Sequence, residues 1–498
     1  MYHLLRVDAQ SPATTKNARV KISSQTHSAA TRLKCFLRTR HLFRLFCLQQ
    51  SKQKIFTQRA FSAGYSAYNS YNNTGGRYIF MNVMIIGGGG REHAIARYIA
   101  NSPRISKLYA LPGNGGISEL AQCVNISAED IDGIVDFAQS HAIDFAIVAP
   151  DDPLAMGAVD RLESVGVKCF GPEQNAAVIE SSKIFAKQLM TKYGIPTAKY
   201  KIFSDTDEAL SYCALSDYPL VVKADGLAKG KGVTVCENFK QAREAVLACM
   251  KDKAFGHSSE KILIEECLRG PEVTVLAFTD GKTIIPMISS MDHKRAYDAN
   301  KGPNTGGMGV VAPNFYYTQE IADECMKSIF LPTMNAMNAE GRTFKGCLYF
   351  GLMLTKDGPK VIEYNCRFGD PEAEAVLPLL AADLFSVMLA VREERLSEVD
   401  VKFIDGASCC VVLASGGYPG KYLTGYEINF GESGDVPGVE IFHAGTRKED
   451  GKFFTAGGRV LAVTAVGENA QQARERAYDA AKCISFEGMR YRSDIGAS

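Results

Sequence analysis

The sequence predicts an α/β protein that begins with a parallel-sheet domain, and three observations lead to this class. From Met81 onward, short apolar runs alternate with stretches of helical spacing, as in parallel strands joined by crossover helices. A glycine-rich turn at residues 87–90 lies between the first expected strand and the first expected helix. The chain of 498 residues also exceeds what one hydrophobic core usually serves, so about two to four domains are expected.

Composition indicates a globular chain with two unlike parts. No apolar run approaches the roughly 18 residues that a membrane span needs, so no membrane partner is expected. Residues 1–80 hold 13 of the 56 basic residues and one of the 55 acidic residues. The rest of the chain therefore carries a net charge of about −11. Nucleic acid is not expected as a partner, because phosphate-backbone binding draws on clustered Lys and Arg. The 14 cysteines include no CxxC pair, which favours reduced and mostly buried thiols.

Residues 1–80 have two interpretations. The segment is basic and rich in Ser, Thr and Tyr, and residues 59–62 resemble a processing site of an organellar presequence. A transit peptide would place the protein in the plastid stroma or the mitochondrial matrix. The alternative, which we favour, is that translation begins at Met81, since residues 75–77 can be encoded by a purine-rich stretch like a bacterial ribosome-binding site. The protein would then be cytoplasmic.

The expected elements divide the rest of the chain into three domains. An N-terminal domain, residues 81–181, has strands at 82–86, 107–110 and 145–149 and helices at 91–100, 130–139 and 155–164. A central domain, residues 182–397, begins with a helix at 182–193 and includes an α+β lid at about 200–272. It continues with strands at 272–278, 283–288 and 360–365. A small C-terminal α+β domain, residues 398–498, has strands at 409–414 and 459–466, a hairpin at 450–451 and a helix at 469–483.

The glycine-rich turn predicts an anion site. Free backbone N–H groups and the helix dipole at a strand-to-helix turn favour a phosphate. A dinucleotide is disfavoured, because Glu92 or His93 stands where the third glycine of GxGxxG belongs and the second strand ends at Leu111 and Pro112 without an acid. A ribose phosphate or nucleotide sugar is therefore preferred over NAD.

Two further polar segments follow neighbouring strands of the same predicted sheet. Asn114 lies in the glycine-rich segment after the second strand, and Asp151 and Asp152 follow the third strand. The carboxyl ends of parallel strands share one edge, so these residues complete a crevice beside the glycine turn. Helix capping is an equally good explanation for Asp151.

A loop rich in lysine and glycine joins two strands at residues 223–233. Lysines neutralise charge and glycines let a backbone approach phosphates, so the loop can fold over a polyphosphate. It lacks the Walker spacing, and a strand rather than a helix follows it. The alternative is a solvated basic hairpin. Farther along, the strand end at Glu265 and Glu266 can offer its backbone to adenine and Glu272 can reach the ribose hydroxyls, although acids at a strand end are common on surfaces.

The expected strand at 360–365 ends in oxygen-bearing side chains. Alternation puts Glu363 and Asn365 on the same side of the sheet, which suits Mg²⁺ held by few protein ligands and substrate phosphates. A polar outer face is the alternative. Arg367 and Asp370 follow immediately, and Arg367 can offer its fork to an oxyanion or a departing phosphate. The long segment at residues 292–309 shows little regular pattern, which is typical of a functional loop. We assign His293 in it to binding and not to proton transfer.

These motifs together resemble one family. The ordered set GGGGREHA, PGNGG, KADGLAKGKGV, DHKR, GPNTGGMG, YNCRFGDPE and SGGYPGKY is similar to the glycinamide ribonucleotide synthetases along all of residues 81–498. The resemblance implies an ATP-grasp fold and an enzyme of de novo purine synthesis. Such an enzyme joins glycine to 5-phosphoribosylamine through glycyl phosphate, while ATP becomes ADP and phosphate. We expect small-molecule partners only, and a monomer or dimer.

The resemblance also implies site residues. ATP would be held by Lys183, Lys223, Lys229, Gly230, Lys231 and Gly232, and Mg²⁺ or Mn²⁺ by Glu363 and Asn365. The sugar phosphate would lie at Gly89, Gly90, Arg91, Glu92, His93, Asn114 and Asp152. Glycine and the acceptor amine would be surrounded by Asp292, His293, Lys294, Arg295, Asn304, Thr305, Gly306, Met308, Arg367 and Asp370. Of these, Lys294, Arg295, Arg367 and Asp370 are the expected catalytic residues.

Three rival functions differ in what they predict. Another ATP-grasp enzyme, such as a carboxylase-type ligase or a formate-dependent transformylase, would share the fold and the metal strand. A nicotinamide-dependent oxidoreductase is suggested only by the glycine-rich turn. A non-catalytic binding protein would keep the fold, but Lys223, Glu363, Asn365 and Arg367 argue against it.

Overall fold

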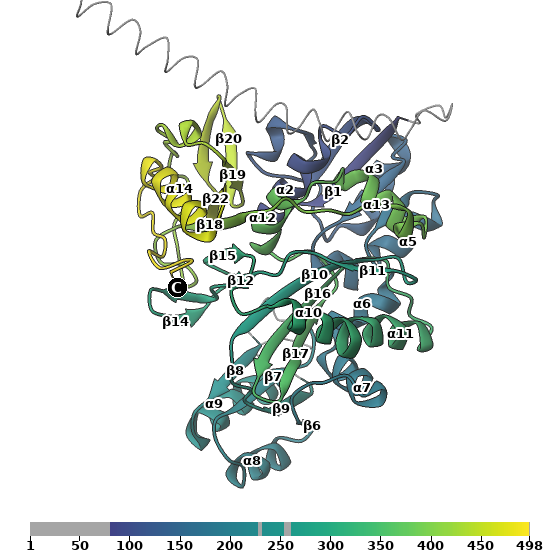
Figure 1. Cartoon of the computed structure of the whole chain (residues 1–498), viewed down its shortest axis with the longest axis vertical. Coiled ribbons are helices and arrows are strands. Elements are labelled where there is room, and N and C mark those ends of the chain that lie inside the picture. Colours follow the sequence, from purple (N-terminus) through teal and green to yellow (C-terminus); the bar gives the residue numbers. More distant parts are fainter. Residues whose placement is uncertain (1–79, 228–231, 253–259, 498) are drawn as a thin grey trace, which may run out of the picture. The chain divides into compact units, whose positions relative to one another are not determined.

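The computed structural model describes residues 80–227, 232–252 and 260–497. Its N-terminal domain is a five-stranded parallel sheet in the order β3-β2-β1-β4-β5; Figure 1 labels β1 and β2 of this sheet. The strands are β1 (Met81–Gly87), β2 (Ile105–Pro112), β3 (Gln122–Cys123), β4 (Phe145–Val148) and β5 (Lys168–Phe170). The helices are α2 (Gly90–Ile99), α3 (Ile131–Ser140), α4 (Asp151–Ala155), α5 (Ala158–Ser164) and α6 (Gln174–Ser181). All four residues of β4 are buried, as expected of a parallel strand covered on both faces.

The predicted helix at 155–164 is wrong in one respect. The chain breaks at Gly157, which has a φ of 82°, and the segment forms the end of α4 and the separate helix α5. Glycine adopts this left-handed conformation at little cost, so the chain can turn between the two short helices. The predictions for residues 1–79 and for the loop at 228–231 lie outside the part of the chain that the structure describes.

A long helix leads into the lid. Helix α7 (Lys183–Tyr193) is capped by Ser182, whose side chain accepts from Phe185 N, and it ends at Gly194 with a φ of 69°. The lid is an antiparallel sheet of β6 (Tyr200–Phe203), β9 (Ile262–Glu266), β7 (Leu220–Ala224) and β8 (Val233–Cys236), in that order. Helices α8 (Thr206–Ala214) and α9 (Phe239–Met250) pack with it around a separate core that includes Phe203, Val222 and Ile264.

A second antiparallel sheet has the order β11-β10-β16-β17. Its strands are β10 (Glu272–Thr279), β11 (Ile284–Pro286), β16 (Gly346–Thr355) and β17 (Gly358–Asn365). Helix α10 (Gln319–Cys325), a π-helical turn (Met326–Phe330) and α11 (Leu331–Ala339) form a continuous helical run that packs Phe330 against Phe350, with ring centroids 4.4 Å apart. Helices α12 (Glu372–Val376) and α13 (Leu384–Arg392) lead toward the C-terminal domain. The turn at 280–281 joins β10 to β11, between the strands predicted at 272–278 and 283–288.

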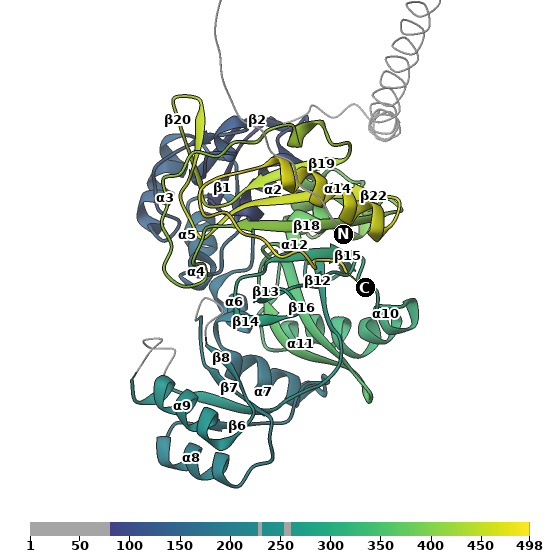
Figure 2. The same cartoon turned by 90° about the vertical axis from the view of Figure 1, so that its left-hand side faces the viewer.

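The C-terminal sheet has the order β12-β15-β18-β22-β19 and is covered by α14 (Ala470–Cys483), as Figures 1 and 2 show. Its strands are β12 (Met291–Asp292), β15 (Gly309–Ala312), β18 (Ala407–Ala414), β22 (Arg459–Gly467) and β19 (Val439–His443). A hairpin of β20 (Thr446–Glu449) and β21 (Lys452–Thr455) carries the predicted turn at 450–451. Thus the central segment of the chain contributes β12 and β15 to a sheet made otherwise by the C-terminal segment.

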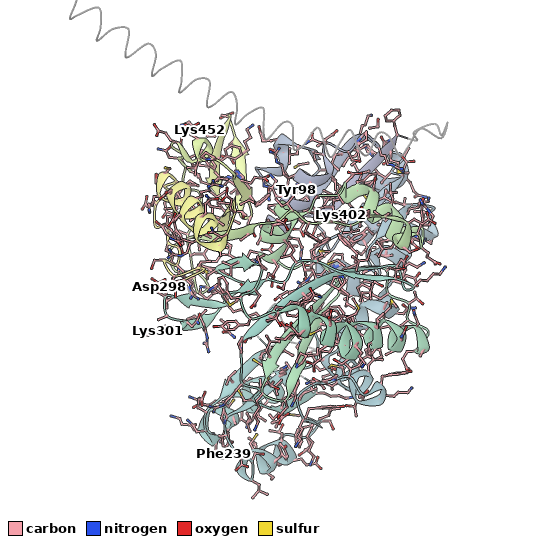
Figure 3. The ribbon with its side chains drawn as sticks, in the orientation of Figure 1. Tyr98, Phe239, Asp298, Lys301, Lys402 and Lys452 are labelled. Carbon is pink, nitrogen blue, oxygen red and sulfur yellow. The ribbon has the colours of Figure 1, made fainter. Side chains whose placement is uncertain are left out.

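The prediction of an irregular loop at 292–309 is wrong. Besides β12 and β15, the segment forms a hairpin of β13 (Arg295–Tyr297) and β14 (Lys301–Asn304), on which Figure 3 labels Asp298 and Lys301. The buried Arg492 holds this hairpin by donating to Arg295 O at 3.0 Å, and Asp494 accepts from Ala299 N at 2.8 Å. Residues near the C-terminus of the chain therefore hold this hairpin in place.

Two further findings concern the described residues as a whole. None of the helices within the described ranges combines the length and the apolar character that a bilayer span requires. The cysteines among these residues are all free thiols, and most are buried.

Candidate functional site

The end of β17 carries two oxygen-bearing side chains on one face of the sheet. Glu363 and Asn365 flank Tyr364, which points the other way and lies in hydrogen-bonding contact with Thr333 Oγ1 at 2.9 Å. The pairing with β16 shifts between Gly351 and Leu352, yet Glu363 and Asn365 keep the alternation expected of a strand. The predicted arrangement of these two residues is thus present.

Three lysines surround the Glu363 carboxylate. Lys294 Nζ lies 3.4 Å from Glu363 Oε1. Burial alone would raise the pKa of Glu363, but Lys294, followed by Lys223 and Lys183, outweighs burial and holds the pKa below its ordinary value. The side chain is therefore an anion at neutral pH, in a strongly cationic setting.

The donor set at this strand fits a hard divalent cation that also binds phosphate. Among the residues that the structure describes, no group of three or more His, Cys, Asp and Glu side chains is placed to hold a metal ion by itself. One carboxylate and one amide are a small set of oxygen ligands, which suits a Mg²⁺ ion that completes its shell with phosphate and water. Glu363 and Asn365 fit that requirement.

The predicted nucleotide lysines lie at the junction of the lid and the second sheet. Lys183 donates to Gly226 O at 2.7 Å. Lys223 donates to Ile362 O at 3.1 Å and pairs with Glu265 Oε2 at 3.0 Å. Gly232 O accepts from Ala224 N at 2.8 Å and closes the base of the loop. Predictions for Lys229, Gly230 and Lys231 lie outside the described residues.

The three predicted nucleotide glutamates occupy different environments. Glu265 is buried and lies between Lys223 and Lys187, whose Nζ is 3.2 Å from Glu265 Oε2. Burial lowers the pKa of Lys187 to about 8 despite this carboxylate. Glu266 accepts from Lys199 N at 2.9 Å at the edge of the lid. Of the three, Glu272 is the one beside Glu363, with Lys294 Nζ at 3.6 Å from its carboxylate.

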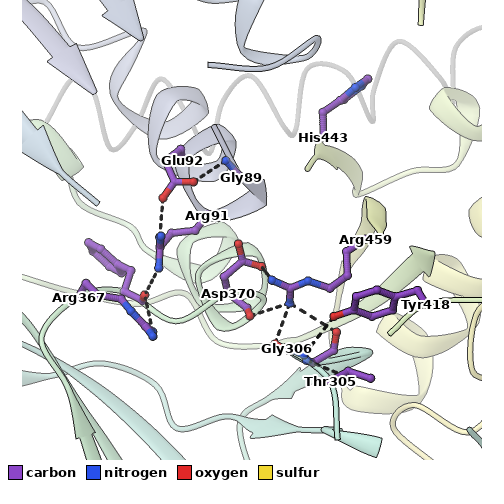
Figure 4. Close-up of polar contacts among 12 residues, drawn as sticks. Gly89, Arg91, Glu92, Thr305, Gly306, Arg367, Asp370, Tyr418, His443 and Arg459 are labelled. Atoms are coloured by element: carbon purple, nitrogen blue, oxygen red, sulfur yellow. Dashed lines mark hydrogen bonds and ion pairs between the residues drawn. The ribbon is translucent and has the colours of Figure 1, made fainter. Parts of the chain in front are cut away.

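At the glycine turn, Glu92 closes the start of helix α2. Its Oε2 accepts from Gly89 N at 2.5 Å and its Oε1 accepts from Arg91 Nε at 2.6 Å (Figure 4). Arg91 also donates to Phe368 O at 3.1 Å, which ties the turn to the loop after β17. A Cβ on Gly88 would lie 2.3 Å from Gly113 O, so this position accepts glycine alone.

His93 and Asn114 join the N-terminal domain to the C-terminal domain. Asn114 Nδ2 donates to Gly88 O at 2.9 Å and to His443 O at 2.7 Å. His93 is buried, and its Nδ1 accepts from His443 N at 2.7 Å. Burial, followed by the neighbouring His443 and Arg97, lowers the pKa of His93 to about 3, so the ring is neutral. Both side chains act in domain contacts here.

Asp370 meets an arginine of the C-terminal domain. Arg459 Nη2 lies 2.7 Å from Asp370 Oδ1, and Arg459 Nη1 donates to Gly306 O and Asp370 O, both at 2.8 Å (Figure 4). Gly306 N donates to Tyr418 Oη at 3.2 Å. Thr305 Oγ1 donates to Lys294 O at 2.9 Å. The segment at 305–307 is thereby fixed against the loop after β17.

Arg367 lies at the boundary of the N-terminal domain. Its Nη2 is 2.9 Å from Glu180 Oε1 and 4.0 Å from Asp151 Oδ2. Asp152 is in the first turn of α4, on the same sheet edge as Asp151. Arg367 therefore lies at the carboxyl edge of the parallel sheet, where a crevice was predicted from the sequence.

Asp292 contributes a buried carboxylate oxygen near Lys294. Its Oδ1 receives no hydrogen bond from the described residues. Burial raises the pKa of Asp292, and the nearby Glu372 raises it further, while Lys294 and Arg459 oppose the shift. Asp292, Lys294, Glu272 and Glu363 line a common cavity of about 10 Å³, enough for one water-sized group.

The remaining predicted substrate residues lie in the hairpin and its supports. Arg295 donates to Gly302 O at 2.8 Å, and Asn304 pairs with Arg295 across the hairpin. His293 Nδ1 lies 3.2 Å from Gly309 O, and burial, followed by Arg492, lowers its pKa. Met308 is fully buried. The structure does not bring these four side chains into the cluster around Glu363.

Comparisons with known proteins decide the family. The family models for the N domain, the ATP-grasp (A) domain and the C domain of phosphoribosylglycinamide synthetase match residues 81–180, 181–373 and 408–498. A phosphoribosylamine–glycine ligase of Caldanaerobacter subterraneus is 47% identical over 417 residues, which are 84% of this chain and 100% of that protein. The chain belongs to the phosphoribosylglycinamide synthetase family.

Other relatives support the family and the fold. The trifunctional purine biosynthetic protein adenosine-3 of Gallus gallus is 46% identical over 83% of this chain and 42% of its own length. The crystal structure of a phosphoribosylamine–glycine ligase from Thermotoga maritima matches with a TM-score of 0.74 and 31% identity, covering 83% of this chain and 100% of that one. A biotin carboxylase domain from Hydrogenobacter thermophilus shares the fold, with a TM-score of 0.66 and 15% identity over 83% of this chain and 92% of that one. The predicted family, enzyme class and ATP-grasp fold are confirmed.

Three residues that contact the candidate site had no role predicted from the sequence. Glu180 is a single acid near the end of a helix, and Arg459 is a single basic residue at the start of a strand. No local pattern distinguishes either. Tyr418 lies within the motif SGGYPGKY, which carries the resemblance but did not suggest a role for it.

Proposed function

We propose that this chain uses ATP to join glycine to 5-phosphoribosylamine, giving glycinamide ribonucleotide, ADP and phosphate. The observation that carries the proposal is the cluster in which Lys183, Lys223 and Lys294 surround Glu363 on β17, with Arg367 and Asp370 in the loop after that strand. Polyphosphate chemistry needs positive charge to neutralise the transferred group. Family membership supports the choice of substrates.

In the first step, a carboxylate oxygen of glycine attacks the γ-phosphorus of ATP, ADP departs, and glycyl phosphate forms. Lys183 and Lys223 would hold the phosphates, and the lid would cover them and exclude water. Glu363 and Asn365 would hold Mg²⁺ or Mn²⁺, which when bound supplies charge to neutralise phosphate oxygens. Asp292, which lines the small cavity beside Lys294 and whose Oδ1 has no partner among the described residues, would accept a hydrogen bond from the glycine ammonium group.

In the second step, the amine of phosphoribosylamine attacks the glycyl carbonyl, phosphate departs, and the amine nitrogen gives up a proton. Arg367 would stabilise the negative charge that develops on oxygen. Asp370, held by Arg459, would orient the amine. The turn at Gly89 and Gly90 would receive the sugar phosphate, because it presents a helix N-terminus.

The strand end at Glu265 and Glu266 would offer its backbone to adenine, and His93 and Asn114 would lie at the sugar phosphate. Each already makes the structural contacts described above. Glu272 would remain the glutamate nearest the nucleotide ribose and the metal.

The proposal is tested by mixing the protein with ATP, Mg²⁺, glycine and freshly prepared 5-phosphoribosylamine and identifying the products. We expect glycinamide ribonucleotide and ADP in equal amounts, and no ADP when glycine is omitted. ADP release that depends on bicarbonate or formate in place of glycine would favour the rival ATP-grasp enzymes.

Assembly and location stay predictions. A monomer or dimer is expected, and sedimentation equilibrium would distinguish them. The cytoplasm is expected if synthesis starts near Met81, and the plastid stroma or mitochondrial matrix if residues 1–80 are a transit peptide. N-terminal sequencing of the native protein separates these cases.

A further inference from the structure

The buried carboxylate of Glu180 accepts hydrogen bonds from three consecutive residues at the end of β17, the strand that carries the proposed metal ligands. Glu180 is in the last turn of α6, and its side chain is 6% exposed. Its Oε2 accepts from Cys366 N at 2.7 Å and from Cys366 Sγ at 3.0 Å. Its Oε1 accepts from Arg367 Nη2 at 2.9 Å.

The fourth contact involves Asn365. In the orientation that satisfies both of its neighbours, the Asn365 amide nitrogen donates to Glu180 Oε1 at 2.9 Å and to Tyr364 O at 3.1 Å. An ionised carboxylate has about four acceptor positions and no proton to donate. These four contacts therefore use the whole capacity of Glu180.

The direction of the contact with Asn365 has a chemical consequence. An amide can present either its oxygen or its nitrogen to a given neighbour, and a hard cation binds only the oxygen. A carboxylate accepts hydrogen bonds and gives none, so it draws the amide nitrogen toward itself. The amide oxygen of Asn365 is then turned away from Glu180.

The contact with Arg367 acts in the same way on the neighbouring side chain. Asn365, the proposed amide ligand, lies two residues before Arg367. Glu180 also accepts a hydrogen bond from the backbone N–H of Cys366, which lies between them. A single carboxylate from another domain thus sets the relative placement of a metal ligand and the arginine that faces the substrates. Residues that orient ligands in this way commonly matter to metal affinity nearly as much as the ligands do.

We propose that Glu180 is a positioning residue that selects the metal-binding orientation of the Asn365 amide and aligns Arg367 with it. This inference rests on the proposed function, because it takes Asn365 as a metal ligand and Arg367 as a substrate contact. No comparison assigns a role to Glu180. It acts through its neighbours and touches neither substrate nor metal.

The test measures Mn²⁺ binding in the presence of ADP by electron paramagnetic resonance, in the wild-type protein and in Glu180→Gln. Glutamine keeps the size of the side chain, but one of its two terminal atoms is a donor and faces groups that also donate. We expect Mn²⁺ affinity to fall by about 10- to 100-fold. We also expect kcat to fall, with little change in the KM for ATP measured at saturating metal.

Cys366→Ala is the matched control. It removes one of the four contacts to Glu180, the thiol, and leaves the Cys366 backbone, Asn365 and Arg367 contacts in place. We expect Mn²⁺ affinity within about threefold of wild type, well below the 10-fold loss typical of a group that orients a ligand. A loss as large as that of Glu180→Gln would mean that general packing in this region controls the metal, and would overturn the proposal.

A double-mutant comparison separates positioning from general stability. In the Asn365→Ala background there is no amide to orient, so Glu180→Gln should reduce Mn²⁺ affinity little further. A full additional loss would contradict the proposal. If Glu180→Gln does not fold, Glu180→Asp supplies the same comparison. Its shorter side chain cannot reach all three residues, so Mn²⁺ affinity should fall in this variant as well.

The outcomes for the two proposals differ. If the wild-type protein makes no amide from ATP, glycine and phosphoribosylamine, the proposed function fails. If the wild-type protein is active and Glu180→Gln binds Mn²⁺ as tightly as wild type, only the role of Glu180 fails.

Discussion

Arg459 and Asp370 form an ion pair with 2.7 Å between Nη2 and Oδ1, and they come from different domains. Arg459 begins β22 of the C-terminal sheet, while Asp370 follows β17. The same guanidinium holds the carbonyl of Gly306. The C-terminal domain therefore completes the proposed acceptor site, even though the nucleotide lysines belong to other domains.

Replacing Arg459 should impair the use of phosphoribosylamine. Arg459→Ala leaves Asp370 and the segment at 305–307 without their shared partner. Charged hydrogen bonds are worth about 1.5–3 kcal/mol, so kcat/KM for phosphoribosylamine should fall by about 10- to 100-fold. The KM for ATP should stay the same. Arg447→Ala, which removes an exposed pair with Glu449, is the control and should retain wild-type kinetics.

Glu363→Gln should increase the demand for Mg²⁺. The substitution keeps the shape of the side chain but removes the anion that three lysines hold ionised. We expect the Mg²⁺ concentration for half-maximal activity to rise by about tenfold or more, together with a lower kcat. Titration of activity with Mg²⁺ at fixed ATP measures this. Unchanged magnesium dependence, as expected for the exposed control Glu320→Gln, would argue against a metal role for Glu363.

Lys223→Ala should weaken the binding of ATP more than the binding of glycine. Lys223 is buried between Glu265 and the strand that carries Glu363. Its loss removes charge from the phosphate site, so the KM for ATP should rise by about tenfold or more while the KM for glycine changes little. Removing it should also lower stability by about 1–3 kcal/mol, because among the described residues Glu265 would then keep only Lys187 as an ion-pair partner. A selective loss of glycine affinity would contradict the assignment; the exposed Lys201→Ala is the control.

Acid should destabilise the contact between the N- and C-terminal domains. Burial lowers the pKa of His93 to about 3 and that of His443 to about 4, so both rings are neutral when folded. Below an unfolded pKa near 6.5 the unfolded chain binds more protons, so this stability is present above pH 6.5 and is lost as pH falls toward the folded values. At pH 5.5 each histidine should lower the free energy of unfolding by about 1 kcal/mol relative to pH 7.5.

Denaturant unfolding at the two pH values checks this expectation. His93→Gln removes one titrating group, so the variant should lose less stability between pH 7.5 and 5.5 than the wild type does. An equal loss in the two proteins would show that His93 does not titrate as its burial indicates.

Much of the fold near the motifs was predictable, because strand periodicity and turn residues are local signals. Helix α7 and strand β22 match the expected helix at 182–193 and the expected strand at 459–466 to within one residue. Strand β16 went unrecognised, since its long apolar run reads equally as a buried helix. The hairpin at 295–304 was also missed, because its exposed polar residues show no alternation and its support comes from Arg492.

The site was predictable in part for a related reason. Glu363, Asn365 and Arg367 lie in one short segment, and their types and spacing point to phosphate chemistry. Glu180 contacts residues 186 positions away, and Arg459 contacts Gly306 across 153 positions. Only the packing of domains creates these contacts, so no single stretch of sequence contains the signal. The same holds for Glu265, whose burial between two lysines depends on how α7 meets the lid.

The central claim is that ATP phosphorylates the glycine carboxyl before the amine attacks it. Glycine labelled with ¹⁸O in both carboxylate oxygens tests this directly, by mass spectrometry of the phosphate and the amide after a complete reaction. Glycyl phosphate predicts one ¹⁸O in the released phosphate and one ¹⁸O retained in the amide carbonyl. Unlabelled phosphate formed together with the amide would contradict the account.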